Sequence, residues 1–139
     1  GQSELVVRSA RDAANGVHAH VGLTADALVP GVRAFDNRFL KEHRYRSDHN
    51  GMKGYIAAYV LKAVTEKVGR FDSKAFAKAM QGIALSAKEY PGILLDVKYD
   101  DKGDLDRASF IVRVSGGRHE FLATLPPSSG AIAAAPGGK

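Results

Sequence analysis

The sequence predicts an α/β protein that forms one part of a larger fold. Three observations predict this class: an opening helix followed by a short alternating strand, a run of three amphipathic helical segments, and strand-rich sequence over residues 93–125. With 139 residues, 45% of them hydrophobic, the chain is long enough to build a core. One strand, a helical run and a late hairpin nevertheless do not make a self-contained doubly wound domain.

The first third of the chain predicts helix, strand and helix. Residues 3–14 have helical spacing and begin at a capping residue, Ser3. The segment VHAHVGL, residues 17–23, alternates apolar and polar side chains as a half-buried strand does. After a loop that contains a proline, an apolar stripe at helical spacing runs from Val32 through about His43.

A long central helix is predicted between a capping signal and a glycine. Ser47 or Asp48 caps its start, and Gly69 ends it after Val68. Its predicted apolar face consists of Met52, Ile56, Tyr59, Val60, Ala63 and Val64.

A shorter helix is predicted from a second cap, Asp72, to about Gly82. Phe71 and Phe76 occupy the two positions whose side chains meet in a hydrophobic staple.

The last third of the chain has the composition of strands and turns. The expected strands are ILLDVKY (93–99), RASFIVRVS (107–115) and RHEFLATL (118–125), and the expected turns are DDKGDLD (100–106) and SGG (115–117). Residues 126–139 are rich in proline, glycine and small side chains, and we expect a flexible tail there.

The acidic turn does not fit a calcium loop of the EF-hand type. Counted from Asp100, the third position is Lys102 and the twelfth is Ile111, where a bidentate glutamate is needed, and Gly103 comes before Asp104 instead of after it. We therefore expect a structural turn in which aspartates accept backbone hydrogen bonds and glycine supplies a positive φ.

The sequence contains few residues in patterns typical of catalytic or metal-binding sites. The absence of cysteine excludes disulfides, thiolate metal sites and cysteine nucleophiles. No serine lies in a nucleophile elbow, and no pair of carboxylates suggests acid–base catalysis. His18 and His20 share one face of a strand, but no third metal ligand is evident nearby. We predict no catalytic residue, no metal site, no cofactor and no enzyme activity.

The chain is mildly basic, with 20 basic and 15 acidic residues and a formal charge of +5. The densest basic stretch, Lys41 to His49, is interrupted by Glu42 and Asp48 and contains one aromatic residue, Tyr45. A nucleic-acid patch there is an alternative. A solvated connection is favoured, so we expect no nucleic-acid partner.

The start of the long helix is the strongest candidate binding site. Asp48, His49, Asn50 and Lys53 gather at an end where free backbone N–H groups attract anions. Ordinary capping of the helix explains the same residue types, and the sequence leaves both interpretations open.

The ordered segments resemble the carboxy-terminal part of type I periplasmic solute-binding proteins, the leucine/isoleucine/valine-binding type of receptor of ABC importers. The resemblance covers roughly residues 5–122. It is carried by the strand GVHAHV, the helix VRAFDNRFLKEH, the tyrosine-containing helix GYIAAYVLKAV, the helix start DSKAFAKAM and the strand and turn GILLDVKYDDKGDL.

The resemblance implies only a portion of a two-lobed α/β fold, because a complete receptor of this family is more than twice as long. Residues 1–44 would belong to lobe two, residues 45–91 to the helices of lobe one, and residues 92–125 to hairpin strands of lobe two. The sheets would then be incomplete, and we expect either a fragment or pairing with another chain through exposed sheet edges.

The resemblance also implies a function. Such a receptor captures a small solute in the periplasm, for instance a branched-chain or other amino acid, an amide or an aromatic carboxylate, and delivers it to a membrane permease. The position that best matches a family ligand contact is Asn50 at the start of the tyrosine-containing helix, with Asp48 and His49 beside it. The loop from Gly22 to Thr24 would approach the hinge. A small-molecule sensor module of the same fold is the alternative.

Overall fold

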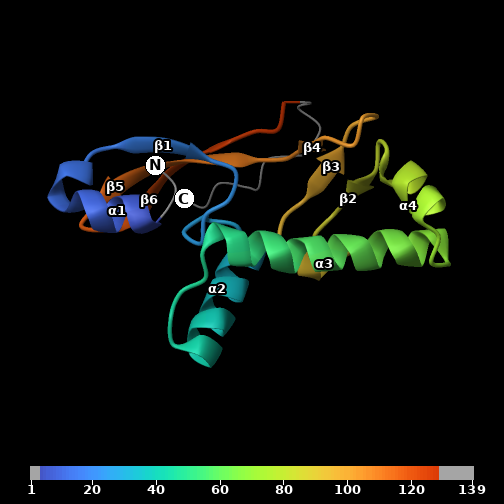
Figure 1. Cartoon of the computed structure of the whole chain (residues 1–139), viewed down its shortest axis with the longest axis horizontal. Helices are drawn as coiled ribbons and strands as arrows, with labels where there is room; N and C mark the ends of the chain where they lie inside the picture. Colours follow the sequence, from blue (N-terminus) through green and yellow to red (C-terminus); the bar gives the residue numbers. More distant parts are fainter. Residues whose placement is uncertain (1–3, 129–139) are drawn as a thin grey trace.

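The computed structural model describes residues 4–128, which form two small sheets joined by helices (Figure 1). The predicted α/β class is therefore confirmed. In chain order the elements are α1 (Glu4–Ala10), η1 (Arg11–Ala14), β1 (His18–Val21), α2 (Pro30–His43), α3 (His49–Val68), α4 (Ser73–Met80), β2 (Ala84–Leu85), η2 (Pro91–Ile93), β3 (Val97–Tyr99), β4 (Leu105–Asp106), β5 (Ser109–Ser115) and β6 (Arg118–Leu125).

The larger sheet, which we call the main sheet, has the strand order β1-β5-β6 and is antiparallel throughout. β1 pairs with β5 from His18 opposite Arg113 to Val21 opposite Phe110. Among the described residues, the outer edges of β1 and β6 have no strand partner. The backbone hydrogen-bonding groups along these edges are thus open to a further strand.

The smaller sheet, which we call the minor sheet, has the order β2-β3-β4 and lies beside α3 and α4 (Figure 1). The sequence did not predict β2 and β4, which have two residues each. The predicted strand 93–99 is correct only for Val97–Tyr99, because η2 and the positive φ of Leu94, 64°, interrupt extended backbone before it.

The pairing of the late strands also differs from a simple hairpin across residues 100–106. β3 turns back onto β4, with Tyr99 opposite Leu105, and the chain then leaves the minor sheet to enter β5 of the main sheet. The turn itself is as expected: Asp100 Oδ1 accepts the N–H groups of Lys102 and Asp104 at 2.9 and 2.8 Å, and Gly103 has φ 89°.

Both predicted aspartate caps are confirmed, and the predicted staple is wrong. Asp48 accepts a hydrogen bond from Gly51 N, and Asp72 accepts one from Ala75 N, each at 2.8 Å. Phe76 packs against the main core, whereas Phe71 is 98% exposed. Phe76 of α4 points toward the core beside α3, whereas Phe71 points into solvent. The two rings therefore do not form a staple.

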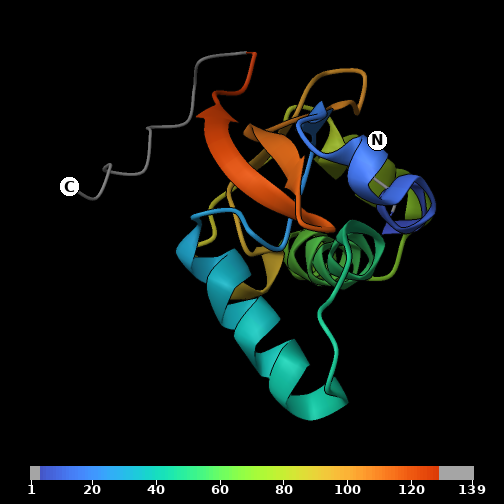
Figure 2. The same ribbon diagram turned by 90° about the vertical axis from the view of Figure 1, so that its left-hand side faces the viewer.

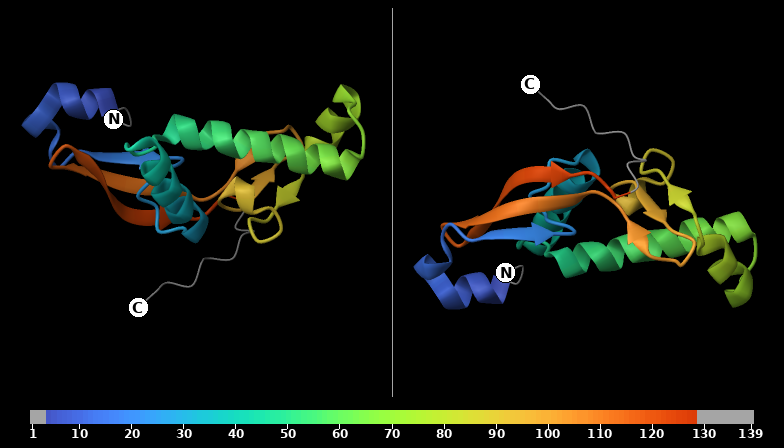
Figure 3. Two further views of the ribbon diagram at one scale, coloured as in Figure 1. Left: turned by 90° about the horizontal axis from the view of Figure 1, so that it is seen from below. Right: turned by 90° about the horizontal axis from the view of Figure 1, so that it is seen from above.

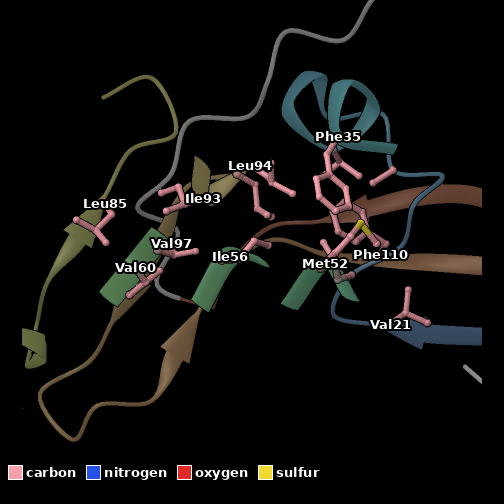
Figure 4. Packing of buried hydrophobic residues seen from close by; sticks show 14 of the residues in the cluster. Val21, Phe35, Met52, Ile56, Val60, Leu85, Ile93, Leu94, Val97 and Phe110 are labelled. Atoms are coloured by element: carbon pink, nitrogen blue, oxygen red, sulfur yellow. The ribbon is translucent and has the colours of Figure 1, made fainter. Parts of the chain in front are cut away.

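The core runs along α3 and reaches both sheets (Figure 4). The buried face of α3 is the predicted one except for Tyr59, which is 38% exposed: it consists of Met52, Ile56, Val60, Ala63 and Val64. Met52 lies near Phe110 and Val21 of the main sheet, and Val60 lies near Val97 of the minor sheet (Figure 4). One helix thus supplies the apolar surface that both sheets need.

The helices before and after β1 complete the covering of the main sheet. α1 buries Val7 beside Val114 of β5, and α2 buries Val32 and Phe35 in the main core. Figure 2, which looks nearly along α3, shows α1 and α2 on opposite sides of that helix. Figure 3 shows that α3 runs lengthwise under the minor sheet and begins near one end of the main sheet.

η2 packs closely against α3. A Cβ atom added at Gly92 would overlap the ring of Tyr59. We therefore expect Gly92→Ala to lower the free energy of unfolding by roughly 1 to 3 kcal/mol, measured by chemical denaturation, because overpacking forces side chains and backbone apart.

Gly54→Ala is the matched control, since a Cβ at Gly54 meets nothing within 4 Å on the exposed side of α3. This variant should gain up to about 1 kcal/mol from helix propensity. Equal stability of the Gly92 variant and the parent protein would contradict the close contact with Tyr59.

Candidate functional site

The candidate site lies where the chain leaves β1 and where it crosses from α2 to α3. The loop after β1 carries Asp26, α2 carries Asp36, and the crossing carries Arg46. The Arg46 guanidinium donates from Nη2 to Asp26 Oδ1 at 2.8 Å, and to Asp36 Oδ2 from Nη2 at 2.9 Å and from Nε at 3.2 Å. We call these three residues the Arg46 clamp, because one side chain ties the crossing to two other segments.

The Arg46 clamp has a strongly buried acid at its centre. The Asp36 side chain is only 4% exposed, compared with 32% for Arg46 and 27% for Asp26. Burial acts to lower the pKa of Arg46, but the hydrogen bonds to Asp36 and Asp26 outweigh it, so the pKa is raised. A buried carboxylate needs such a cation, because an unpaired one is costly.

The sequence analysis did not identify the Arg46 clamp. One signal was available: Asp36 lies beside Phe35 in the apolar stripe of α2, where an acid is expected only if it has a partner. Which cation serves it could not be read from the sequence, because Arg46 follows ten residues later, across the left-handed end of α2 at Arg44.

The predicted residues at the start of α3 lie directly after the Arg46 clamp. Asp48 and Asn50 are exposed and His49 is half-buried. Asp48 caps the helix through Oδ1, and the buried Ser47 donates its hydroxyl to the Asp48 carbonyl oxygen at 3.1 Å. The capping interpretation is therefore confirmed for Asp48. Contact of Asp48, His49 and Asn50 with a ligand stays a prediction.

A cavity of about 690 Å³ brings these residues together with the loop after β1. The cavity opens between α1, the inner face of the main sheet and the start of α3. Its lining consists of Val7, Val21, Leu23, Thr24, Ala25, Asp26, Tyr45, Arg46, Ser47, Asp48, His49, Asn50, Val112, Gly117, Arg118 and His119. The predicted loop residues Leu23 and Thr24 thus face the same space as Asp48 to Asn50, and Gly22 does not line it.

The walls of the cavity combine apolar and polar chemistry. Val21 and Val112 of the main sheet supply an apolar wall, and Asp48, Arg118 and His119 lie around it with charged or titratable groups. Arg118 and His119, at the start of β6, were not predicted as site residues. Such a mixture suits a small organic molecule with an apolar body and a polar or charged end.

The histidine pair on β1 lies on the other face of the main sheet. His20 shares a hydrogen bond of 2.8 Å between its Nε2 and Ser109 Oγ, which gives this ring a structural partner. Within residues 4–128, no group of three or more histidine, aspartate or glutamate side chains is placed to hold a metal ion. None of the helices in that range is both long and apolar enough to cross a membrane.

Three solved structures of solute-binding proteins resemble the chain. The leucine-binding protein LivK of Thermotoga maritima matches 92% of the chain with a TM-score of 0.73 and 18% sequence identity. An ABC-transporter solute-binding protein of R. palustris in complex with benzoate matches 88% with a TM-score of 0.68 and 19% identity. One from Rhodopseudomonas palustris BisB5, in complex with 3,4-dihydroxybenzoic acid, matches 83% with a TM-score of 0.67 and 21% identity.

The chain spans only about a third of these proteins: 36%, 33% and 32% of their respective lengths. No family model and no curated protein matches the chain. The chain therefore has part of the type I periplasmic-binding-protein fold, and the expected similarity to a carboxy-terminal portion of such a receptor is confirmed at the level of the fold.

The Arg46 clamp generates a stability prediction. We expect Arg46→Gln to lower the free energy of unfolding by roughly 2 to 4 kcal/mol in chemical denaturation, because it leaves the Asp36 carboxylate buried without a cation. Adding Asp36→Asn to this variant should restore part of the loss, since the neutral amide is easier to bury.

Arg113→Gln is the control for removal of an arginine from an ion pair. Arg113 pairs with Glu120 at 2.6 Å, but both side chains are close to half exposed, so the cost should stay below about 1 kcal/mol. If the Arg46 and Arg113 variants lost the same small amount, the Arg46 clamp would not be the stabilising contact inferred here.

Proposed function

We propose that this chain is a portion of the solute-binding receptor of an ABC importer. The single observation that carries the proposal is the match of nearly the whole chain to three such proteins. In this role the chain binds a small molecule and catalyses no reaction of its own. The receptor works in the periplasm and hands its ligand to a membrane permease.

The ligand class we propose is a branched-chain or other amino acid, an amide or an aromatic carboxylate. The apolar wall at Val21 and Val112 suits an aliphatic side chain or a ring, and the polar groups at the start of α3 suit the charged end. The proposed ligand contacts are Asp48, His49 and Asn50. Because Asp48 Oδ1 already caps the helix, its second oxygen is the one left for a ligand.

We further propose that residues 1–44 and the late hairpin strands belong to lobe two of the receptor and the helices between them to lobe one. The sequence places these boundaries at 1–44, 45–91 and 92–125. The pairing of β1 with β5 supports the grouping of the first and last segments. The pairing of β3 with β2 favours a later start of the last segment, after Asp106. The open edges of the main sheet are where a further strand, from this receptor or from another copy, would pair.

The proposal predicts which backbone amides respond to ligand. Benzoate or leucine, added at millimolar concentration to the ¹⁵N-labelled chain, should shift the amide signals of residues 22–24 and 48–50 in a saturable way. The reason is that these two segments face one cavity. The measurement is a series of two-dimensional ¹H–¹⁵N NMR spectra.

Asn50→Ala should weaken this binding about threefold to tenfold, the effect of one lost hydrogen bond. Asn37→Ala, at an exposed position of α2, is the matched control and should bind as the parent does. Shifts that are absent, that occur only elsewhere, or that benzyl alcohol and uncharged sugars reproduce would count against the proposal.

A further inference from the structure

A second arginine lies at the other crossing between the two sheets. β4 ends at Asp106 and β5 begins at Ser109, so Arg107 and Ala108 form the link from the minor sheet to the main sheet. The guanidinium of Arg107 reaches the carboxyl end of β1. Its Nη2 is 4.0 Å from the position that a Cβ atom would have at Gly22.

Arg107 differs from Arg46 and Arg113 because no anion accompanies it. Arg46 and Arg113 each pair with carboxylates. Over residues 4–128, Arg107 has neither an ion pair nor a hydrogen bond. The adjacent Asp106 carboxylate accepts the backbone N–H of Ser128 at 2.8 Å.

The surroundings of Arg107 exclude part of the water that would otherwise solvate its charge. The side chain is half-buried, and burial lowers the pKa of its guanidinium, while the nearby Tyr99 hydroxyl acts weakly in the opposite direction. Burial likewise raises the pKa of Tyr99. A partly desolvated cation is costly unless an anion binds it, so this site lacks a partner.

Other hydrogen-bonding groups lie on the same side of the main sheet. Val21 is opposite Phe110, so Gly22 continues β1 toward the start of β5 at Ser109. The Ser109 hydroxyl already contacts His20 Nε2 at 2.8 Å. Arg107 thus lies near Gly22, and a hydrogen bond joins His20 and Ser109 at the adjacent ends of β1 and β5.

The position of this group within the fold also favours a ligand. Gly22 directly follows β1, which is an edge strand of the main sheet among the described residues. A glycine there lets a ligand approach the backbone. The planar guanidinium of arginine binds a carboxylate through two parallel hydrogen bonds.

We propose that Arg107 and Ser109, beside Gly22, form a binding site for the carboxylate of a small organic acid. The site lies apart from the cavity at the start of α3, because neither Gly22, Ser109 nor Arg107 lines that cavity. It is therefore a separate inference from the function proposed above and does not depend on Asp48, His49 or Asn50.

The test is an NMR titration that monitors the side chain of Arg107. Sodium acetate and sodium benzoate are titrated into the ¹⁵N-labelled chain at constant ionic strength, with sodium chloride as the reference anion and benzamide as the uncharged analogue of benzoate. The Nε–Hε signal of Arg107 and the amide signals of Gly22 and Ser109 should shift saturably with both carboxylates. Chloride and benzamide should leave them in place.

Two variants of Arg107 separate the effect of its positive charge from that of its paired hydrogen-bond donors. Arg107→Gln should weaken acetate binding at least about tenfold, and Arg107→Lys, which keeps the charge but loses the paired donors, should weaken it less. Arg113→Gln, on the strand that follows Arg107, is the control and should bind acetate as the parent does. Inorganic phosphate serves as a comparator, and a response to phosphate alone would overturn the assignment to carboxylates.

The other possible results of the titrations also support or overturn the carboxylate site at Arg107. Equal shifts with chloride, or unchanged acetate binding by Arg107→Gln, would overturn the proposal. If Arg107→Gln does not fold, the parent titration and Arg107→Lys still decide it. Shifts at residues 48–50 without a response of Arg107 would support the proposed receptor function and refute the second site, whereas the reverse pattern would support this site alone.

Discussion

The buried face of α3 is the constraint on which the rest of the structure depends. Five buried side chains of this 20-residue helix face two sheets that share no strand. At its start the helix meets the main sheet, and further along it lies under the minor sheet (Figure 4). Because each sheet has three strands within residues 4–128, each needs this common apolar surface to exclude water.

Two connections in the fold each carry an arginine, one paired with carboxylates and the other not. At the crossing before α3, Arg46 is held by two carboxylates and fixes the loop after β1, α2 and the start of α3 relative to one another. At the crossing before β5, Arg107 reaches the same end of β1 without a carboxylate. One arginine therefore serves the architecture, and the other is available to an anion from outside the described chain.

Local signals explain what the sequence could predict, and long-range contacts explain what it could not. The aspartate caps and the turn at Asp100 were predicted because each hydrogen bond spans at most four residues. The pairing of β3 with β2 and the Arg46 clamp were missed because they join segments whose proximity no local pattern encodes. The predicted ligand residues face a cavity that also includes Arg118 and His119, which come close to them only through the fold.

The pairing of β1 with β5 has a consequence for the order in which the protein folds. His20 and Ser109 are 89 residues apart in sequence, whereas α3, α4 and the minor sheet contact one another within a much shorter stretch. The entropy of closing so long a loop delays the main sheet relative to these more local contacts. During synthesis β1 emerges from the ribosome before β5, and it cannot pair with β5 until the 89 residues from His20 to Ser109 have been made.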